Sequence, residues 1–337
     1  TNPTHPGLYN GPYRITEIVS GSYIVLEQNE YWKGKTPGFK QIQVKTIEKT
    51  SALEANLLSG AIDYIAGEAG LSLDQAVSFE KRHSERYKVS YKPGLIYEHL
   101  DLMLDNPILS DLRVRKALIH SIDRTAISNR LFSGKQPVAH NKIHPLDWIH
   151  TNTIKKYSFD PQKARELLND AGYSESNPFP KLEILFNTNE DHRKLALAIQ
   201  QMWQQNLGIE VELVNQDWKV YLSREMVGDF QVSRAGWIGD YEDPNTFLDL
   251  MRPNRGNNKT GWEDANYDSI VERANSMNDQ TQRYELLKEA ERILIDNMPI
   301  IPLYTYVRSY QLSPDVKGYN PHILDHHHPK FIYLERD

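Results

Sequence analysis

The segment RAGWIGDYEDP, residues 234–244, combines side chains that could bind or transform a ligand. It places the cation Arg234 and the anion Asp240 around two glycines and the large rings of Trp237 and Tyr241. Arginine offers paired hydrogen bonds to a carboxylate, and aspartate accepts the hydrogens of an ammonium group. Aromatic rings can form the walls of such a site, and glycines let the backbone approach a ligand. The segment could therefore form a binding site for a zwitterion, or equally an intramolecular Arg–Asp pair at a loop.

Catalysis is an alternative use of the same segment, because Asp240, Glu242 and Asp243 lie close together in the chain. A glycosidase needs two carboxylates roughly 5–9.5 Å apart across a cleft, and neighbours in sequence seldom provide this geometry. Pro244 predicts the start of a helix with Asp243 as its N-cap. The standard phosphate-loop, dinucleotide, zinc-protease and serine-hydrolase motifs are absent from the sequence. A hydrolase that uses Asp240 with a second acid remains an alternative.

The run His326–His327–His328, preceded by Asp325, raises the question of a metal site. In a strand His326 and His328 would lie on one face. Two imidazoles without further ligands form a weak site. We therefore expect a polar loop before the final strand, with no metal and no cofactor.

Composition limits the class of protein. The chain has 337 residues, of which 39% are hydrophobic and 25% charged, which predicts a globular protein of two domains. A net charge of -6 argues against nucleic-acid binding. The absence of cysteine excludes disulfides, cysteine-ligated zinc and thiol catalysis. No apolar run reaches the roughly 18 residues of a membrane span, and the first residues lack the apolar core of a signal peptide.

The first third of the chain reads as an α/β region. We expect strands at 13–19 and 22–29 around a Ser20–Gly21 turn, then a strand at 41–48. Residues 50–60 predict a helix, with Ser51 and Glu54 at capping-box spacing and Gly60 at its end. A strand at 61–66 follows, so a helix crosses between strands.

The remainder continues this alternation of strands and helices. Strands are expected at 87–91, 97–104, 181–188, 209–215, 230–238, 300–312 and 331–334, and helices at 111–134, 160–172, 191–207, 217–226, 266–277 and 281–297. Asp111 and Asp160 are the expected N-caps of two of these helices. Two α/β units without a long linker favour a binding cleft between lobes.

Several long segments resemble one known family. They are GPYRITEIVSGSYIVLEQNEYW, LSDLRVRKALIHSIDR, NTNEDHRKLALAIQQMW, LVNQDWKVYL and FQVSRAGWIGDYEDPNTFLD, in the order and at the spacing of periplasmic oligopeptide-binding proteins. These are family 5 extracellular solute-binding proteins of peptide ABC transporters. The resemblance covers nearly the whole chain. It implies a two-lobed α/β fold of the large-solute class of periplasmic binding proteins, with mixed sheets flanked by helices.

The resemblance also implies roles for individual residues. Asp240 matches the family aspartate that holds the α-ammonium of a peptide. Arg234 matches an arginine that can meet the carboxylate of a shorter peptide, and His192 a histidine that can meet that of a longer one. A cation at a helix N-terminus, where we expect His192, would add to a dipole that already favours anions.

Aromatic residues complete the ligand-binding set that the resemblance implies. Trp218 matches a tryptophan that lines a pocket, and Tyr97 falls where the family has tyrosines near the cleft. Trp237 and Tyr241 are expected to wall the site around Asp240.

On the family layout, residues 1–94 and 306–337 belong to the first lobe, and residues 95–305 form the second. Family members carry a longer N-terminal portion that includes a signal peptide, so this chain resembles a C-terminal fragment. The implied function is that of a solute-binding component of an ABC importer, which captures oligopeptides and delivers them to a membrane permease. We expect no enzyme, no nucleic-acid partner and a monomer, in the periplasm or as a Gram-positive cell-surface lipoprotein. The alternatives are a binder of murein peptides, dipeptides, a nickel chelate or sugar oligomers, and the hydrolase.

Overall fold

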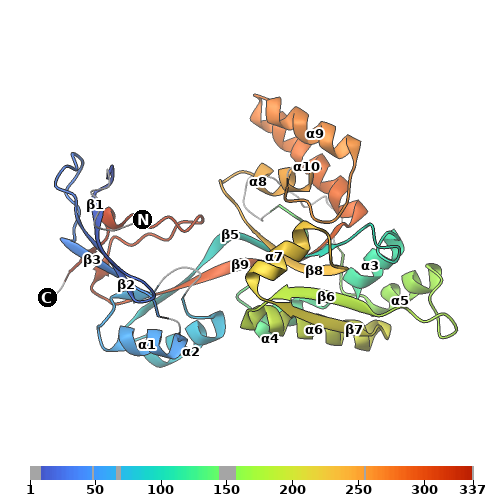
Figure 1. Cartoon of the computed structure of the whole chain (residues 1–337), viewed down its shortest axis with the longest axis horizontal. Helices are drawn as coiled ribbons and strands as arrows, with labels where there is room; N and C mark the ends of the chain where they lie inside the picture. Colours follow the sequence, from blue (N-terminus) through green and yellow to red (C-terminus); the bar gives the residue numbers. More distant parts are fainter. Residues whose placement is uncertain (1–8, 48, 66–69, 144–156, 254–255, 336–337) are drawn as a thin grey trace. The chain divides into compact units, whose positions relative to one another are not determined.

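The computed structural model describes residues 9–47, 49–65, 70–143, 157–253 and 256–335. The chain divides into two compact units, the first formed by Thr1–Gly94 with Val307–Asp337 and the second by Leu95–Tyr306. Both chain ends therefore belong to the first unit (Figure 1). The strands β5 (Lys88–Leu102) and β9 (Ile300–Leu312) have residues in both units. These units differ from the expected lobes only at residue 306, and their identity as lobes stays a prediction.

The first unit begins with an antiparallel sheet of β1 (Tyr13–Val19), β2 (Tyr23–Gln28) and β3 (Gln41–Lys45), in the order β1-β2-β3. The predicted hairpin turn lies between β1 and β2, where Gly21 has the left-handed φ of 71° that glycine adopts without strain. The three predicted strands are confirmed, with small differences at their ends.

Two helices follow in the first unit. Helix α1 (Thr50–Leu58) starts after Lys49, which makes no side-chain cap, so the predicted capping box of Ser51 and Glu54 is wrong. Ser51 lies inside the helix, and the Glu54 carboxylate instead pairs with the Arg82 guanidinium. Helix α2 (Leu73–His83) has a true capping box of Ser72 and Gln75.

The core of the first unit lies between these helices and the neighbouring strands. Its buried residues are Leu53, Leu57, Ile65, Leu71, Ala76, Phe79 and Tyr87. The short strand β4 (Tyr64–Ile65) pairs with β9. Near the end of the chain, β10 (Val316–Lys317) pairs with β11 (Tyr333–Leu334). A 3-10 turn at Pro329–Phe331 precedes β11. The predicted final strand at 331–334 is thus shortened to two residues.

The second unit is organised around a mixed sheet. β6 (Leu182–Asn187), β7 (Val211–Gln216) and β8 (Val232–Ile238) are parallel, and β8 pairs antiparallel with β5. The complete strand order is β4-β9-β5-β8-β6-β7. Helix α6 (Glu190–Leu207) connects β6 to β7, and α7 (Trp218–Met226) connects β7 to β8, so successive parallel strands are joined by crossing helices. The predicted strands at 87–91 and 97–104 are one strand, β5.

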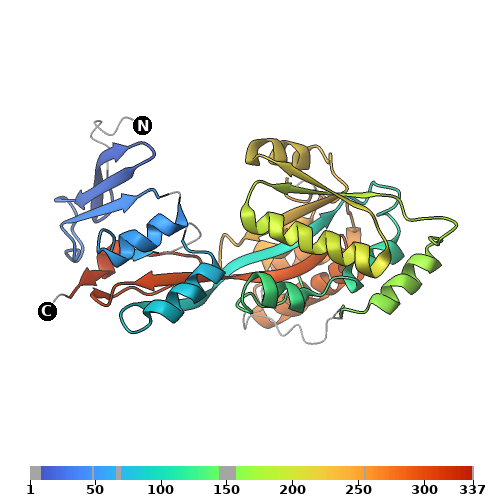
Figure 2. The ribbon, with the colours of Figure 1, turned by 90° about the horizontal axis from the view of Figure 1, so that it is seen from below.

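Helix α6 shows how the sequence forms this layer. The Asn189 side chain accepts hydrogen bonds from two backbone N–H groups of the first turn, and Gly208 ends the helix at a φ of 71°. Leu195, Ile199 and Trp203 recur every four residues and are fully buried. This face of α6 contacts β6 and β7 (Figure 2).

The other helices of the second unit complete its core. Instead of one predicted helix over 111–134, the structure has α3 (Leu112–His120) and α4 (Arg124–Leu131). The Asp123 side chain caps α4 at the break, while Asp111 caps α3 as predicted. Helix α5 (Pro161–Asp170) has the predicted Asp160 cap.

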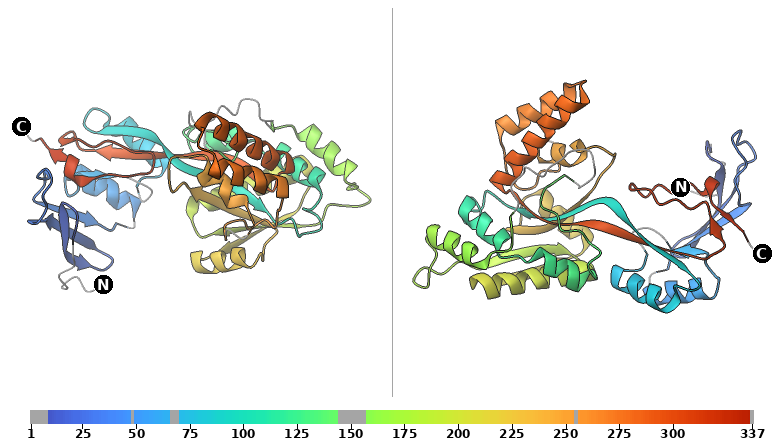
Figure 3. Two further views of the ribbon diagram at one scale, coloured as in Figure 1. Left: turned by 90° about the horizontal axis from the view of Figure 1, so that it is seen from above. Right: turned by 180° about the vertical axis from the view of Figure 1, so that it is seen from behind.

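The described residues between β8 and β9 form further helices. A short helix α8 (Asn245–Leu248) and a 3-10 turn (Asp249–Met251) follow β8, and α9 (Ala265–Ser276) packs beside α10 (Gln280–Asn297), as Figure 3 shows. None of the helices in the described ranges combines the length and apolar composition needed to cross a lipid bilayer.

Candidate ligand-binding site at the end of β8

Asp240 lies two residues beyond the end of β8, and its side chain is exposed. Its backbone N–H donates to Thr246 Oγ1 over 3.0 Å, which holds the turn in place. Within the part of the chain that the structure describes, its carboxylate makes no hydrogen bond and no ion pair. The carboxylate is therefore available to a cation from outside the chain.

The two glycines of this segment serve packing and not backbone flexibility, since neither has a positive φ. A Cβ at Gly239 would lie 2.5 Å from Leu95 Cδ2. A Cβ at Gly236 would lie 3.0 Å from Glu98 Oε2 and 3.2 Å from Arg234 Nη2. The expectation that these glycines bring the backbone close to a ligand has no support in this geometry. Gly236 instead makes room for a buried ion pair.

That ion pair joins Arg234 on β8 to Glu98 on β5, where Nε and Nη2 donate to the two carboxylate oxygens. The side chains are only 10% and 0% exposed. Burial opposes the charge on Arg234, but Glu98 outweighs this effect and raises the pKa of the guanidinium. The predicted Arg–Asp pair at a loop is therefore wrong, because Arg234 pairs with Glu98 inside the sheet. A role of Arg234 toward a ligand stays a prediction.

His192 lies in the first turn of α6, as expected, where its surroundings disfavour the charged imidazolium. Its Nδ1 lies 2.9 Å from Asn187 Oδ1, an oxygen that also accepts from Arg234 Nη1 over 3.3 Å. Burial, and then the charge of Arg234, lower the pKa of His192 to about 3. A pKa lowered in this way disfavours the positive charge predicted at this helix end, and the role of His192 toward a ligand stays a prediction.

Three of the predicted aromatic residues surround the end of β8 or begin α7. Trp218 is 57% exposed and stacks on Tyr221 with ring centroids 5.5 Å apart. Tyr241 is 46% exposed, beside Asp240. Trp237 is partly buried, and its Nε1 has no acceptor among the described residues.

Tyr97 does not belong to this surface. It is completely buried opposite Trp237 in the β5–β8 ladder, and the Lys142 ammonium lies 5.0 Å from its ring centroid. Burial raises the pKa of its hydroxyl well above the ordinary value. The expectation that Tyr97 lies near a ligand is wrong, because it is a core residue.

Sequence reasoning missed the buried ionisable residues of β5. Besides Glu98, the strand carries His99 and Asp101, whose side chains are 3.2 Å apart, and His99 lies 3.2 Å from the Lys142 ammonium. Burial, and then Lys142, lower the pKa of His99 to about 4, and burial lowers that of Lys142 to about 8. The available signal was three ionisable residues within the otherwise apolar segment 95–102.

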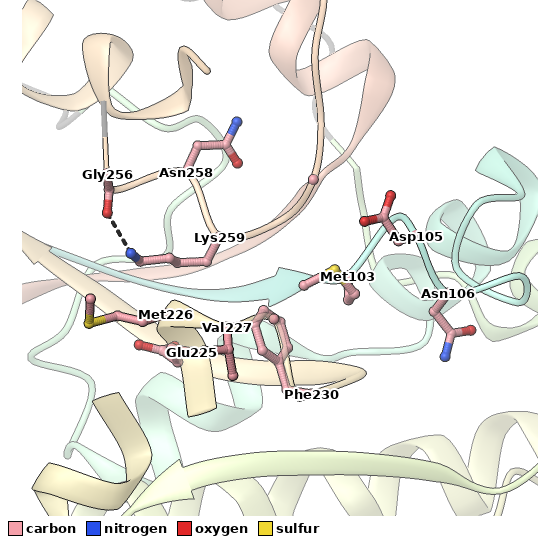
Figure 4. A pocket seen from close by; sticks show the side chains of 12 residues that line it. Met103, Asp105, Asn106, Glu225, Met226, Val227, Phe230, Gly256, Asn258 and Lys259 are labelled. Carbon is pink, nitrogen blue, oxygen red and sulfur yellow. Dashed lines mark hydrogen bonds between the residues drawn. The ribbon is translucent and has the colours of Figure 1, made fainter. Parts of the chain in front are cut away.

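A cavity of about 600 Å³ lies at the opposite end of β8, around Met103 and Phe230 (Figure 4). Its polar lining includes Asp105, Asn258 and Glu225. Burial raises the pKa of Glu225 to about 7. None of the predicted site residues lines it. The cavity is thus separate from the surface around Asp240.

The histidine run does not converge on a metal position. The ring of His326 stacks on that of His322 at 5.5 Å and 8°, while His327 pairs with Asp325. Across the described residues, no group of three or more His, Asp or Glu side chains is placed to hold a metal ion.

The structure thus combines two compact α/β units with an exposed carboxylate and an exposed ring just beyond the end of β8. Over residues 1–259 the sequence matches the family described as "Bacterial extracellular solute-binding proteins, family 5 Middle", and the chain belongs to this family.

Individual relatives agree with this assignment. The chain is 31% identical over 326 residues to the oligopeptide-binding protein OppA of Bacillus subtilis, covering 94% of this chain and 59% of the relative. It is 30% identical over 337 residues to the periplasmic murein peptide-binding protein MppA of Escherichia coli, with coverages of 94% and 59%. The chain therefore spans about three fifths of the length of these relatives.

Solved structures confirm the predicted fold class. The murein tripeptide-binding protein MppA of Escherichia coli superposes with a TM-score of 0.81 at 29% identity, covering 97% of this chain and 65% of that one. The Haemophilus influenzae OppA complex with the peptide RPPGFSPFR gives 0.79 at 29% identity, with coverages of 96% and 64%. These relatives carry the names of binding proteins and not of enzymes.

Proposed function

We propose that this protein is the solute-binding component of a bacterial ABC importer and captures oligopeptides by their amino terminus at Asp240. The observation that carries the proposal is the exposed Asp240 carboxylate, which has no partner in the described part of the chain. A free peptide presents an ammonium group that must lose water on binding, and a fixed carboxylate replaces those hydrogen bonds. The names of the relatives support a peptide as the solute.

Exposed aromatic rings of the second unit could contact the rest of a peptide. Trp218 and Tyr241 offer exposed rings that can cover side chains of many shapes, since aromatic packing has little sequence preference. The Trp237 indole N–H is buried and has no acceptor among the described residues, so only the exposed part of this ring can contact a ligand. A receptor of this kind reads what all peptides share, so its side-chain pockets are permissive.

The wider role follows from the family. We propose that the protein acts outside the cytoplasmic membrane, as a monomer without catalytic activity, and that its ligand-bound form is recognised by a membrane permease. The two units are then the two lobes of the binding protein.

A murein peptide is the second candidate solute, favoured by the 30% identity to MppA. Such a peptide also carries an ammonium group for Asp240. Mass spectrometry of the material that denaturation releases from the natural full-length protein distinguishes the two candidates.

The test of the main proposal is Asp240→Asn in the natural full-length protein, with affinity for a mixed tripeptide and tetrapeptide pool measured by calorimetry. Loss of the charged hydrogen bond predicts an affinity decrease of roughly 1.5–3 kcal/mol. Acetylation of the peptide amino groups should weaken binding to the native protein and have little further effect on the variant.

Glu242→Gln removes a charge two residues away and is the matched control, with near-native affinity expected. Retained affinity in Asp240→Asn would contradict the proposal. Retained affinity together with lost peptide turnover would instead indicate the hydrolase.

A further inference from the structure

We propose that Asp243 is a positioning residue for peptide capture, which engages Arg283 and thereby leaves the Asp240 carboxylate free to receive the ammonium group of a ligand. This inference rests on the proposed function, because it concerns the same carboxylate. It assigns different tasks to two acids that lie three residues apart in the turn after β8. Asp243 binds a cation of the protein itself, and Asp240 binds the cation of the ligand.

The first observation is the ion pair between Asp243 and Arg283, which lies in the first turn of α10. Nη1 donates to Oδ2 over 2.7 Å, and Nη2 donates to Oδ1 over 2.8 Å. Two parallel hydrogen bonds of this kind engage both carboxylate oxygens and fix the guanidinium in one orientation. The arginine and aspartate side chains are only 20% and 23% exposed, so water competes with this pair less than with an exposed one. The guanidinium is therefore held at Asp243.

The second observation is that Asp243 is tied to the backbone of its own turn. Its Oδ1 accepts the Asn245 N–H over 2.9 Å, and its own N–H donates to the Tyr241 carbonyl over 2.9 Å. The Thr246 N–H donates to the Asp243 carbonyl over 3.2 Å, while Thr246 Oγ1 accepts the Asp240 N–H over 3.0 Å. The helix that starts here, α8, packs against α10 (Figure 1). Asp243 is thus held by side chain and backbone, whereas Asp240 is held by its backbone alone.

The third observation is that Arg283 lies close enough to act on Asp240. Three residues of chain span at most about 11 Å, which limits the distance between the Cα atoms of the two aspartates. Burial raises the pKa of the Tyr241 hydroxyl, and the charges of Asp243 and Asp240 add to this effect, so both carboxylates act on one ring. A guanidinium without its own anion in this place would attract the Asp240 carboxylate and repel an incoming ammonium group. Engagement by Asp243 removes this competition.

The experiment compares two synthetic tetrapeptide libraries of equal composition, one with free and one with acetylated amino ends, by calorimetry on the natural full-length protein. In Asp243→Asn the amide keeps an acceptor for the Asn245 N–H but loses the charge that engages Arg283. The dissociation constant of the free library should rise roughly five- to tenfold, because an unpaired charge about 10 Å away is only partly screened. Binding of the acetylated library should stay unchanged, since it brings no ammonium group. An equal loss for both libraries would overturn the inference.

Removal of both charges distinguishes this role from a purely structural one. The double variant Asp243→Asn/Arg283→Gln leaves no unpaired cation, so its affinity for the free library should return to within about threefold of the native value. If the ion pair only stabilised the turn, the double variant would bind no better than Asp243→Asn, and the inference would be overturned. Arg283→Gln alone should bind the free library at least as tightly as the native protein. Weaker binding by Arg283→Gln would overturn the inference even if Asp243→Asn did not fold.

Two controls remove the same charges elsewhere. Glu242→Gln removes an acid one residue away and leaves Arg283 engaged by Asp243, so near-native affinity is expected. Arg292→Gln removes an arginine of the same helix whose side chain is 59% exposed, and it should also have little effect. A loss in Glu242→Gln equal to that in Asp243→Asn would show that the net charge of the turn sets the affinity, and would overturn the role of Arg283.

Asp240→Asn separates this inference from the proposed function. Unchanged affinity in Asp240→Asn would overturn the proposed function and the inference together. Weaker binding by Asp240→Asn with native binding by Asp243→Asn would overturn the inference alone. In the Asp240→Asn background, Asp243→Asn should cause little further loss, because the carboxylate for which Arg283 competes is absent.

Discussion

Glu98 and Asp240 are both carboxylates next to β8, yet their surroundings give them opposite uses. Glu98 is completely buried and compensated by Arg234, so its charge contributes to the arrangement of β5 against β8. Asp240 is exposed and held only through its backbone, so its charge remains directed at solvent. Residue type alone does not distinguish them; Glu98 lies within β5, whereas Asp240 lies beyond the end of β8.

Glu291 on α10 provides a pH-dependent test of burial. It is fully buried, its Oε1 accepts the Ile143 N–H, and burial raises its pKa from 4.5 to about 8. The folded protein therefore holds a proton that the unfolded chain releases above about pH 4.5. The stability from this group is fully present below that pH and is lost as the pH rises towards about 8.

Glu291→Gln keeps an acceptor for the N–H and removes the titration. Relative to the native protein, the free energy of unfolding of this variant should rise by about 1.4 kcal/mol per pH unit between the two pKa values. Urea unfolding across this range measures the difference. Glu289→Gln, on the exposed side of the same helix, should stay within about 0.5 kcal/mol throughout. A pH-independent difference for Glu291→Gln would show that the carboxyl is ionised in the folded state.

At the scale of elements, helix ends are where local sequence decides structure. The Asn189 side chain accepts hydrogen bonds from the Asp191 and His192 N–H groups, so it fixes the turn that carries His192. Asn189→Ala should lower the free energy of unfolding by about 1 kcal/mol. Lys49→Ala is the matched control, because Lys49 precedes α1 without any side-chain cap, and it should change stability by less than about 0.5 kcal/mol. Equal effects of the two changes in thermal or urea unfolding would contradict the capping argument.

Local sequence signals at element ends also explain which elements could be predicted from the sequence. Helices α5, α6 and α7 were predicted well because each has a polar cap followed by an apolar stripe. The division of 111–134 into α3 and α4 was missed, since the helical period continues through the break and only the Asp123 cap marks it. β5 was predicted as two strands because Pro93 and Gly94 interrupt the pattern, although the strand continues through them.

The ligand-binding role of the candidate residues stays a prediction, and a local pattern could indicate only features that do not depend on distant partners. The exposure of Asp240, Trp218 and Tyr241 follows from their places at the ends of elements. The state of Arg234 depends on Glu98, which lies 136 residues away in the chain and meets it through the β5–β8 pairing. A local pattern carries no information on such a pair.

At the scale of the whole molecule, the two units differ in whether they are formed by one continuous segment of the chain. The second unit is one continuous segment, Leu95–Tyr306, while the first combines the two ends of the chain. The first unit depends on this combination, because β4 obtains its partner when Tyr64 pairs with Leu312. Their folding should therefore differ when the chain is divided.

A fragment of residues 95–306 should fold alone and unfold in one cooperative transition. It retains β8, β6 and β7 entire, the parts of β5 and β9 that lie in the second unit, and the buried Trp203, whose Nε1 donates to the Leu118 carbonyl over 3.1 Å. Such a closed set of strands and helices buries its own core, so folding does not need the first unit. Residues 1–94 alone lack the partner strand of β4 and should show no cooperative transition. Urea unfolding followed by tryptophan fluorescence and far-ultraviolet circular dichroism measures both. Because β5 and β9 are cut within strands, a gradual transition of the fragment, or probes that do not coincide, would show that these strands bind the two units into one folding unit.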